Sequence, residues 1–109
     1  MKPEQKLELA RRARVMRALG QESRLCIVHS LREGERNVTE LTDEVGSDIS
    51  TVSRHLSVLQ GAGIVYARRK GRMVYYGLRA PCVLRFFECV DRVLEESSSA
   101  CGLEGRAVT

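Results

Sequence analysis

The hydrophobic pattern of residues 48–61 predicts a short helix with one apolar face. Its apolar residues recur at the spacing of a single helical stripe, which must face a core: Ile49, Val52, Leu56 and Leu59. Asp48 is suited to cap the start of this helix, and Gly61 is suited to follow its end as the C′ residue. The polar residues lie on or beside the opposite face: Ser50, Thr51, Ser53, Arg54, His55 and Ser57. The helix is therefore suited to present polar side chains to something outside the protein.

The flanking segments predict a helix-turn-helix followed by a β-hairpin. Residues 38–45 predict a shorter helix with Val38, Leu41 and Val45 inward, and Gly46-Ser47 forms the turn between the two helices. In such a motif the second helix takes the recognition role. Residues 64–70 and 72–78 are β-rich runs joined at Gly71, which predicts a hairpin, or wing. Four cations crowd its tip: Arg68, Arg69, Lys70 and Arg72.

Three further helices are expected outside this unit. Residues 4–19 and 22–32 predict helices that end at Gly20 and Gly34. The second of these has its apolar side at Leu25, Ile27, Val28 and Leu31. Residues 81–97 predict a last helix that starts at Pro81. Its apolar residues cover a wider arc than one core-facing stripe needs, so we expect this helix to bind a partner.

These elements define the expected fold class, which is mainly α (α+β). It is a winged helix-turn-helix of about five helices with a two-stranded β-hairpin, all within one domain over residues 1–97. Residues 98–109 are small and polar and predict a flexible tail.

The charge distribution narrows the class of partner. The chain of 109 residues has 18 Lys and Arg against 14 Asp and Glu, a net charge of +4. Residues 61–87 contain six of the basic residues and no acidic one: Arg68, Arg69, Lys70, Arg72, Arg79 and Arg85. The positive charge is thus concentrated around the wing, which favours a polyanionic partner. Because the sequence has neither a membrane-spanning apolar run nor a signal-peptide block, we expect a cytoplasmic protein without membrane association.

The sequence resembles the ArsR/SmtB family of winged-helix repressors. The resemblance covers residues 13–94 and is carried by STVSRHL at residues 50–56, GIV at 63–65, RR at 68–69 and VYY at 74–76. It implies a homodimer, formed through the first and last helices, that binds double-stranded DNA at an imperfect palindrome. Arg54 is suited to reach guanine, and the other polar residues of its helix to reach base edges or phosphates. The four wing cations are suited to phosphate or minor-groove contact.

The resemblance also implies an inducing metal or metalloid, but two of the family's usual sites are incomplete. A Cys-x-Cys pair of the arsenic-type members falls here on Asn37 and Thr39, so that site is absent. The zinc-type site falls on Ala80, Cys82, Val93 and Glu96, of which at most two can coordinate a metal. The chain has four cysteines, which we expect to be reduced thiols. We interpret Cys26 as a core residue.

The remaining cysteines suggest a different site for a soft ion. Cys82 and Cys89 lie about 10.5 Å apart along a helix axis, too far to share one ion within a chain. An antiparallel pairing of the last helices would bring Cys82 of one protomer towards Cys89 of its partner. Cys101 could fold back to add a third sulfur, giving a site for arsenite, antimonite or a thiophilic metal.

Other interpretations of the cysteines remain open at this point. Cys82 and Cys89 could simply pack in a dimer interface, or act as a redox or persulfide switch, which requires accessible thiolates. A winged-helix regulator without an effector is a further alternative. A cysteine enzyme needs a base beside its nucleophile, and the only histidines are His29 and His55. Because His55 belongs to the recognition helix, we expect no enzymatic activity.

Overall fold

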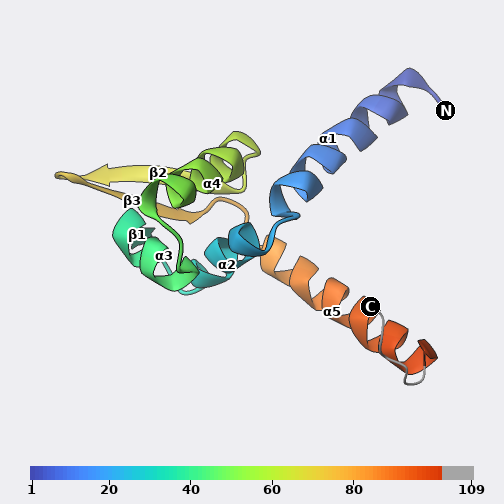
Figure 1. Ribbon diagram of the computed structural model, residues 1–109. Helices are drawn as coiled ribbons and strands as arrows, with labels where there is room; N and C mark the ends of the chain where they lie inside the picture. The colour runs from blue at the N-terminus through green and yellow to red at the C-terminus, as the bar shows by residue number, and fades with distance from the viewer. Residues whose placement is uncertain (102–109) are drawn as a thin grey trace.

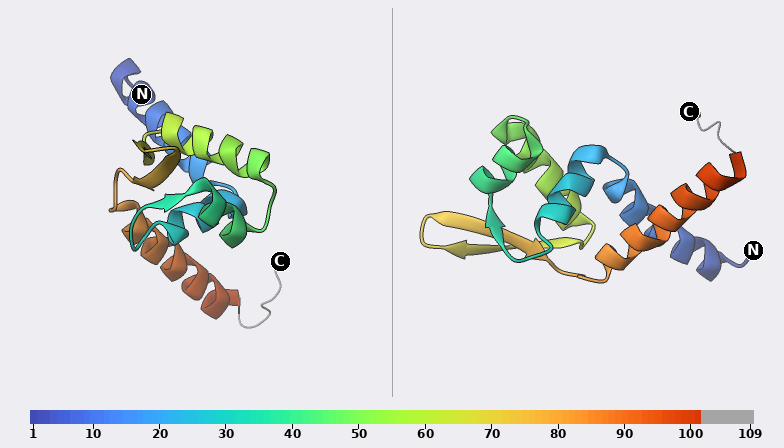
Figure 2. Two further views of the ribbon diagram at one scale, coloured as in Figure 1. Left: turned by 90° about the vertical axis from the view of Figure 1, so that its left-hand side faces the viewer. Right: turned by 90° about the horizontal axis from the view of Figure 1, so that it is seen from below.

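The computed structural model describes the backbone of residues 1–101 and the side chains of residues 1–97. This part of the chain forms α1 (Pro3–Leu19), α2 (Glu22–Ser30), β1 (Arg36–Asn37), α3 (Val38–Val45), α4 (Ile49–Gly61), β2 (Val65–Lys70), β3 (Met73–Leu78) and α5 (Val83–Cys101) (Figure 1). The wing β2–β3 projects from one end of the body, and α1 and α5 extend from the other (Figures 1 and 2). The predicted winged helix-turn-helix class is therefore confirmed.

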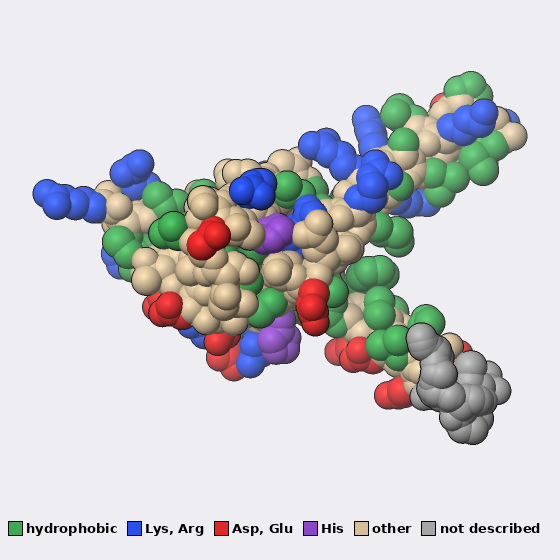
Figure 3. All heavy atoms as spheres, viewed as in Figure 1, with side chains coloured by type: hydrophobic (Ala, Val, Ile, Leu, Met, Phe, Trp, Pro, Cys, Tyr) green, Lys and Arg blue, Asp and Glu red, His purple; other side chains and the backbone are tan. Residues whose placement is uncertain are grey.

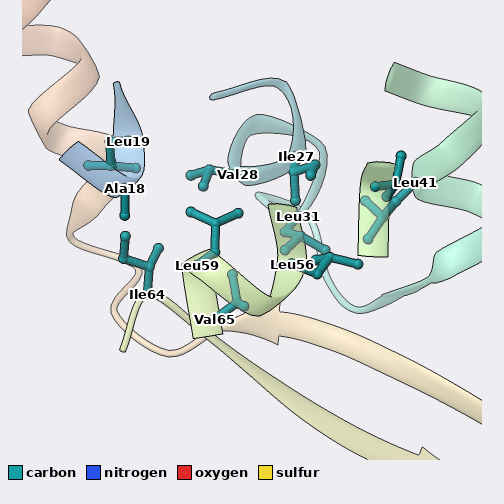
Figure 4. Packing of buried hydrophobic residues seen from close by; sticks show 11 residues of the cluster. Ala18, Leu19, Ile27, Val28, Leu31, Leu41, Leu56, Leu59, Ile64 and Val65 are labelled. Atoms are coloured by element: carbon teal, nitrogen blue, oxygen red, sulfur yellow. The ribbon is translucent and has the colours of Figure 1, made fainter. Parts of the chain in front are cut away.

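One apolar cluster holds α2, α3 and α4 together and fixes them against the base of the wing. Its fully enclosed side chains come from these three helices and from β2 (Figure 4): Ile27, Val28, Leu41, Val52, Leu56, Leu59 and Val65. Only the last residues of α1, Ala18 and Leu19, reach this cluster. The rest of α1 and most of α5 lie outside it, so both helices depend on the core at one end only.

The two helices of the helix-turn-helix are capped by side chains. Asn37 Oδ1 accepts a hydrogen bond from the Glu40 amide at 2.9 Å, and Glu40 Oε1 accepts one from the Asn37 amide at 2.9 Å. Asp48 Oδ1 accepts from the Thr51 amide at 2.7 Å, as the sequence predicted. Each cap satisfies amides that the first turn of a helix leaves without a partner.

Two details of the predicted helices are wrong. Ile49 is 56% exposed and does not join the stripe formed by its three predicted companions, because it is the first residue of α4 and extends past the edge of the core. Gly61 is the last helical residue rather than the C′ residue. The glycine with positive φ is Gly63, at 81°, which turns the chain from α4 into the wing.

The wing belongs to a three-stranded antiparallel sheet in the order β1-β3-β2. The hairpin turn contains only Gly71 and Arg72, since Lys70 pairs with Met73, and Gly71 adopts a φ of 63° that suits a tight hairpin. The short strand β1, which pairs Arg36 with Tyr76, was not predicted.

The ends of α2 and α5 also differ from the prediction. α2 stops at Ser30, and residues 31–33 form a turn instead of its last residues. Pro81 and Cys82 lie in a turn before α5, whose first residue is Val83. α5 continues to Cys101, so the first four residues of the predicted tail are helical, and residues 102–109 lie outside the described part. None of the described helices is both long enough and apolar enough to cross a bilayer.

Candidate nucleic-acid interface

The predicted recognition residues share the outward side of α4. Ser50, Ser53, Arg54 and Ser57 are exposed, and Thr51 and His55 are half-buried at the margin. The buried stripe of α4 holds the helix against the core from the other side. The guanidinium of Arg54 and the hydroxyls of Ser53 and Ser57 form no hydrogen bond to other residues of the described chain. These groups are therefore available to an external partner.

Ser50 differs from the other exposed serines because its hydroxyl is already in use. Ser50 Oγ donates to Asp48 Oδ1 at 3.0 Å. The pKa of Asp48 is lowered by the hydrogen bonds from Thr51 and then by that from Ser50, so the cap stays ionised at neutral pH. Ser50 can still accept a hydrogen bond, but donating to a base or phosphate would require it to leave the cap.

His55 is a neutral group on this helix. Its pKa is lowered from 6.5, first by burial and then by the nearby positive charges of Arg24 and Arg54. A neutral imidazole has one donor nitrogen and one acceptor nitrogen. His55 can therefore form hydrogen bonds with a base edge or a phosphate, but it adds no charge to the surface.

The four cations of the wing are not equivalent. Arg68 forms an ion pair with Glu35, with its Nη2 2.6 Å from Oε1 and its Nε 3.0 Å from the same oxygen. Tyr66 also donates to Glu35, at 2.6 Å. The hydrogen bond from Arg68, then that from Tyr66, lowers the pKa of Glu35 from 4.5 to about 2. Arg69, Lys70 and Arg72 are exposed and have no ion-pair partner in the described chain.

Charge is separated on the face of the molecule that Figure 3 shows. Lys and Arg side chains gather at the wing tip and along α1, whereas Asp and Glu gather on the lower side of the body and along α5 (Figure 3). The sequence revealed the wing cluster, but it gave no sign of the pairing of Arg68 with Glu35, which joins residues 33 positions apart.

The candidate thiol ligands are accessible but do not form a site within one chain. Cys82 and Cys89 are free and exposed. Cys26 is half-buried, so its predicted place in the core is wrong, and its Sγ lies 3.9 Å from the carbonyl oxygen of Glu44. The side chain of Cys101 lies outside the described part of the chain. Within that part, no three cysteine, histidine or acidic side chains gather closely enough to hold a metal ion.

The two incomplete family sites have structural reasons to lack metal here. Asn37, at one of the Cys-x-Cys positions, caps α3. At the positions of the zinc-type site, Ala80 and Val93 offer no side-chain ligand, and Val93 is 64% exposed. The residues present therefore do not fit either site in its usual form.

Comparison with known proteins agrees with this geometry. Residues 21–67, from α2 into β2, match the family described as "Bacterial regulatory protein, arsR family". The HTH-type transcriptional repressor SmtB of Mycobacterium tuberculosis is 44% identical over 64 residues, which are 59% of this chain and 47% of that protein. A cadmium resistance transcriptional regulatory protein CadC homolog of Staphylococcus aureus is 37% identical over 67 residues, 61% of this chain and 55% of that protein. The chain thus spans about half the length of these curated relatives.

The match is more complete for solved structures. The homodimeric winged helix-turn-helix DNA-binding domain of Mb0332 from Mycobacterium bovis, described as a possible ArsR-family transcriptional regulator, is 30% identical, with a TM-score of 0.77. The similarity covers 98% of this chain and 97% of that domain. The fold, the matched segment and the relatives together show that this chain belongs to the ArsR/SmtB family of winged helix-turn-helix regulators.

Proposed function

We propose that this protein is a transcriptional repressor that binds a palindromic operator in double-stranded DNA as a homodimer. The main support is the polar outward side of α4, with Arg54 and two serines free to bond, next to a wing with three unpaired cations. An α-helix with such a face fits the major groove, where Arg54 can bind guanine through two hydrogen bonds. The unpaired wing cations then supply phosphate contacts, which add affinity but little base selection.

The homodimer is supported by apolar surface that the single chain leaves exposed. The exposed apolar residues of the two outer helices include Leu7 and Met16 of α1 and Val90, Val93 and Leu94 of α5. α1, α2 and α5 also line an apolar hollow of about 580 Å³. Apolar patches of this kind are rare on soluble monomers. A dimer of the 12.2 kDa chain should persist at micromolar concentration in sedimentation experiments, and a monomer would contradict the proposal.

Substitution of Arg54 by alanine tests the DNA-binding role. Specific binding should weaken by about 1–3 kcal/mol and base choice should relax, because a bidentate contact to one base is lost. The matched control is Arg32→Ala, which removes an exposed arginine of the turn after α2 that belongs to neither α4 nor the wing. Operators selected from a random pool by the wild-type protein would serve as ligands. Equal loss of affinity on operator and random DNA would show that α4 does not choose the sequence.

We further propose that a thiophilic metal or metalloid, such as arsenite, releases the repressor from DNA by binding Cys82 and Cys89 between protomers. Both thiols are exposed; Cys82 lies in the turn before α5, and Cys89 lies six residues past the first residue of α5, roughly 9 Å along the helix axis from Val83. Two sulfurs that share an ion must lie much closer than that. Cys82 of one protomer and Cys89 of its partner would therefore form each thiol pair, with Cys101 as the third ligand. The name of the CadC homolog supports metal sensing in this family.

A heterodimer provides the sharpest test of this arrangement. With Cys82→Ser in one chain and Cys89→Ser in the other, one complete cross-chain pair remains, so it should bind half the ion of the wild type. Either homodimeric single variant should still bind operator, since neither cysteine lies on α4 or the wing. It should fail to release the operator when the ion is added, because each cross-chain pair has lost one thiol. Zero binding by a folded heterodimer would contradict the cross-chain site. Release by peroxide or persulfide without any ion would favour the thiol switch instead.

We assign the protein no catalytic activity and place it in the cytoplasm with its DNA. Nucleophilic catalysis by a cysteine requires a base within hydrogen-bond reach. No hydrogen bond joins the side chain of His29 or His55 to a cysteine within the described part of the chain. A hydrolytic activity that depends on Cys82 or Cys89 would contradict this assignment.

A further inference from the structure

A basic pocket lies where the carboxyl-terminal half of α4 meets α1 and α2. Its volume is about 610 Å³, and three arginines line it, two from α1 and one from α2: Arg14, Arg17 and Arg24. The other lining residues carry no charge, and those used below are Gln21, Ser57 and Gly61. The ion pairs found in the described chain involve Arg12 and Arg68, so none of the three pocket arginines has a carboxylate partner there.

Two of these arginines have N–H groups that form no hydrogen bond within the described chain. Arg14 Nη2 donates to the carbonyl oxygen of Gly61 at 2.9 Å, which fixes α1 against the end of α4. Arg24 Nε is enclosed and has no hydrogen-bond partner in the described chain. The positive charge of Arg24 also contributes to the lowered pKa of His55. The three guanidinium groups bring positive charge together without a carboxylate partner in the described chain, so an anion that enters the pocket would supply the opposite charge and accept hydrogen bonds from their accessible N–H groups.

The pocket continues the polar side of α4. Ser57 and Gly61 follow Arg54 by three and seven residues, so all three lie on the same side of the helix. A duplex bound along this side would pass the mouth of the pocket. Guanidinium groups form paired hydrogen bonds with phosphate oxygens, which makes a backbone phosphate a well-matched ligand.

We propose that Arg14, Arg17 and Arg24 bind a backbone phosphate of the DNA duplex that α4 contacts. The DNA-contacting surface then runs from the wing tip across α4 to α1 and the start of α2, with unpaired cations at both ends of the recognition helix. This inference rests on the proposed function. A free phosphate ester has the same chemistry, but the DNA backbone is favoured because Ser57 belongs both to the pocket and to the exposed side of α4.

Charge-removing variants of the pocket test this assignment. Arg17→Gln and Arg24→Gln should each weaken binding to operator and to random-sequence duplex by the same factor, and flatten the dependence of log affinity on log salt by about one per protomer. A random duplex of roughly 30 base pairs is long enough for both half-sites of a dimer. Arg32→Gln, with the same charge change outside the pocket, should leave the salt dependence as in the wild type. Arg14→Gln is less informative because Arg14 also holds α1 to α4.

The outcomes separate this inference from the proposed function. Wild-type salt dependence in both folded variants would overturn the phosphate contact while leaving operator binding by α4 intact. Binding of inorganic pyrophosphate by the free protein, lost in these variants without any change in DNA affinity, would show a small-anion site and would also overturn it. No duplex binding by the wild-type protein would overturn the proposed function and this inference together. Arg17 is exposed on α1, so its replacement keeps the test valid if Arg24→Gln fails to fold.

Discussion

Arg69 should contribute more to DNA affinity than its neighbour Arg68, although both are exposed arginines of β2. Successive side chains of a strand point to opposite faces. Val65 is buried in the core, so Arg69, four residues on, shares the face that packs against α4. Arg68 lies on the other face with Tyr66, where the Glu35 carboxylate binds it. Of these two arginines, Arg69 is the one that lies on the side of the recognition helix and has no ion-pair partner in the described chain.

The size of the effect follows from counterion release. Each phosphate contact contributes about 0.9 to the slope of log affinity against log salt, and a homodimer loses two contacts when Arg69 becomes alanine. The slope should therefore flatten by about two. Between roughly 50 and 200 mM salt, the ratio of wild-type affinity to variant affinity should fall about tenfold. This follows because the ratio varies with salt concentration to a power of about minus two, and the salt concentration changes fourfold. Arg68→Ala should flatten the slope by much less.

Fluorescence anisotropy measures both the affinity and its salt slope when it is recorded over a salt series on a selected operator and on a random duplex. The affinity loss for Arg69→Ala should be the same on the two duplexes, because a phosphate contact carries no base preference. If Arg68→Ala and Arg69→Ala flatten the slope equally, the pairing with Glu35 does not remove Arg68 from the interface, and our division of the wing cations is wrong.

Three further predictions concern the stability of the fold. Gly77→Ala should lower the free energy of unfolding by about 1–3 kcal/mol in urea titrations, because the added Cβ would overlap the ring of Tyr66; wild-type stability would show that the ring can move away. The Glu35 ion pair should contribute fully to the free energy of unfolding above pH 4.5, and this contribution should disappear as the pH falls towards 2, because folding lowers the pKa of Glu35. The Glu35→Gln variant should lack this part of the pH dependence. Leu56→Ala should cost about 2–5 kcal/mol, whereas Ile49→Ala should change stability by about 0.5 kcal/mol or less, and equal effects would contradict the exposure of Ile49.

Local periodicity was sufficient to predict the body of the fold. The helix of residues 38–45 has the predicted bounds, and Val52, Leu56 and Leu59 are enclosed as expected. The wing was predicted from two β-rich runs joined at a glycine. Periodicity failed at helix ends, because residues such as Ile49 keep the spacing of the stripe after the core beneath them has ended.

Contacts between distant parts of the sequence could not be predicted. β1 has two residues and no apolar pattern, and it exists because β3 is close enough to pair with it. Glu35 reaches Arg68 across 33 positions, and Arg14 reaches Gly61 across 47. These contacts decide which cations are neutralised and which surround the basic pocket. The sequence therefore predicted where the cationic residues lie, whereas the fold determines which of them have no ion-pair partner in the described chain.

The distribution of free groups also explains why a switch at α5 would be effective. α4 presents one guanidinium and a few hydroxyls, so one half-site offers about 1–3 kcal/mol of discrimination through its bidentate contact. Selective binding by the proposed homodimer then requires both recognition helices at a spacing of about 34–36 Å, which its interface would set. The exposed apolar residues Val90, Val93 and Leu94 lie on α5, which extends from the body, and the thiols Cys82 and Cys89 lie next to it and on it. An ion bound between protomers there need shift the equilibrium by only about 1–3 kcal/mol to change operator affinity several-fold to a hundred-fold, without contact with α4 itself.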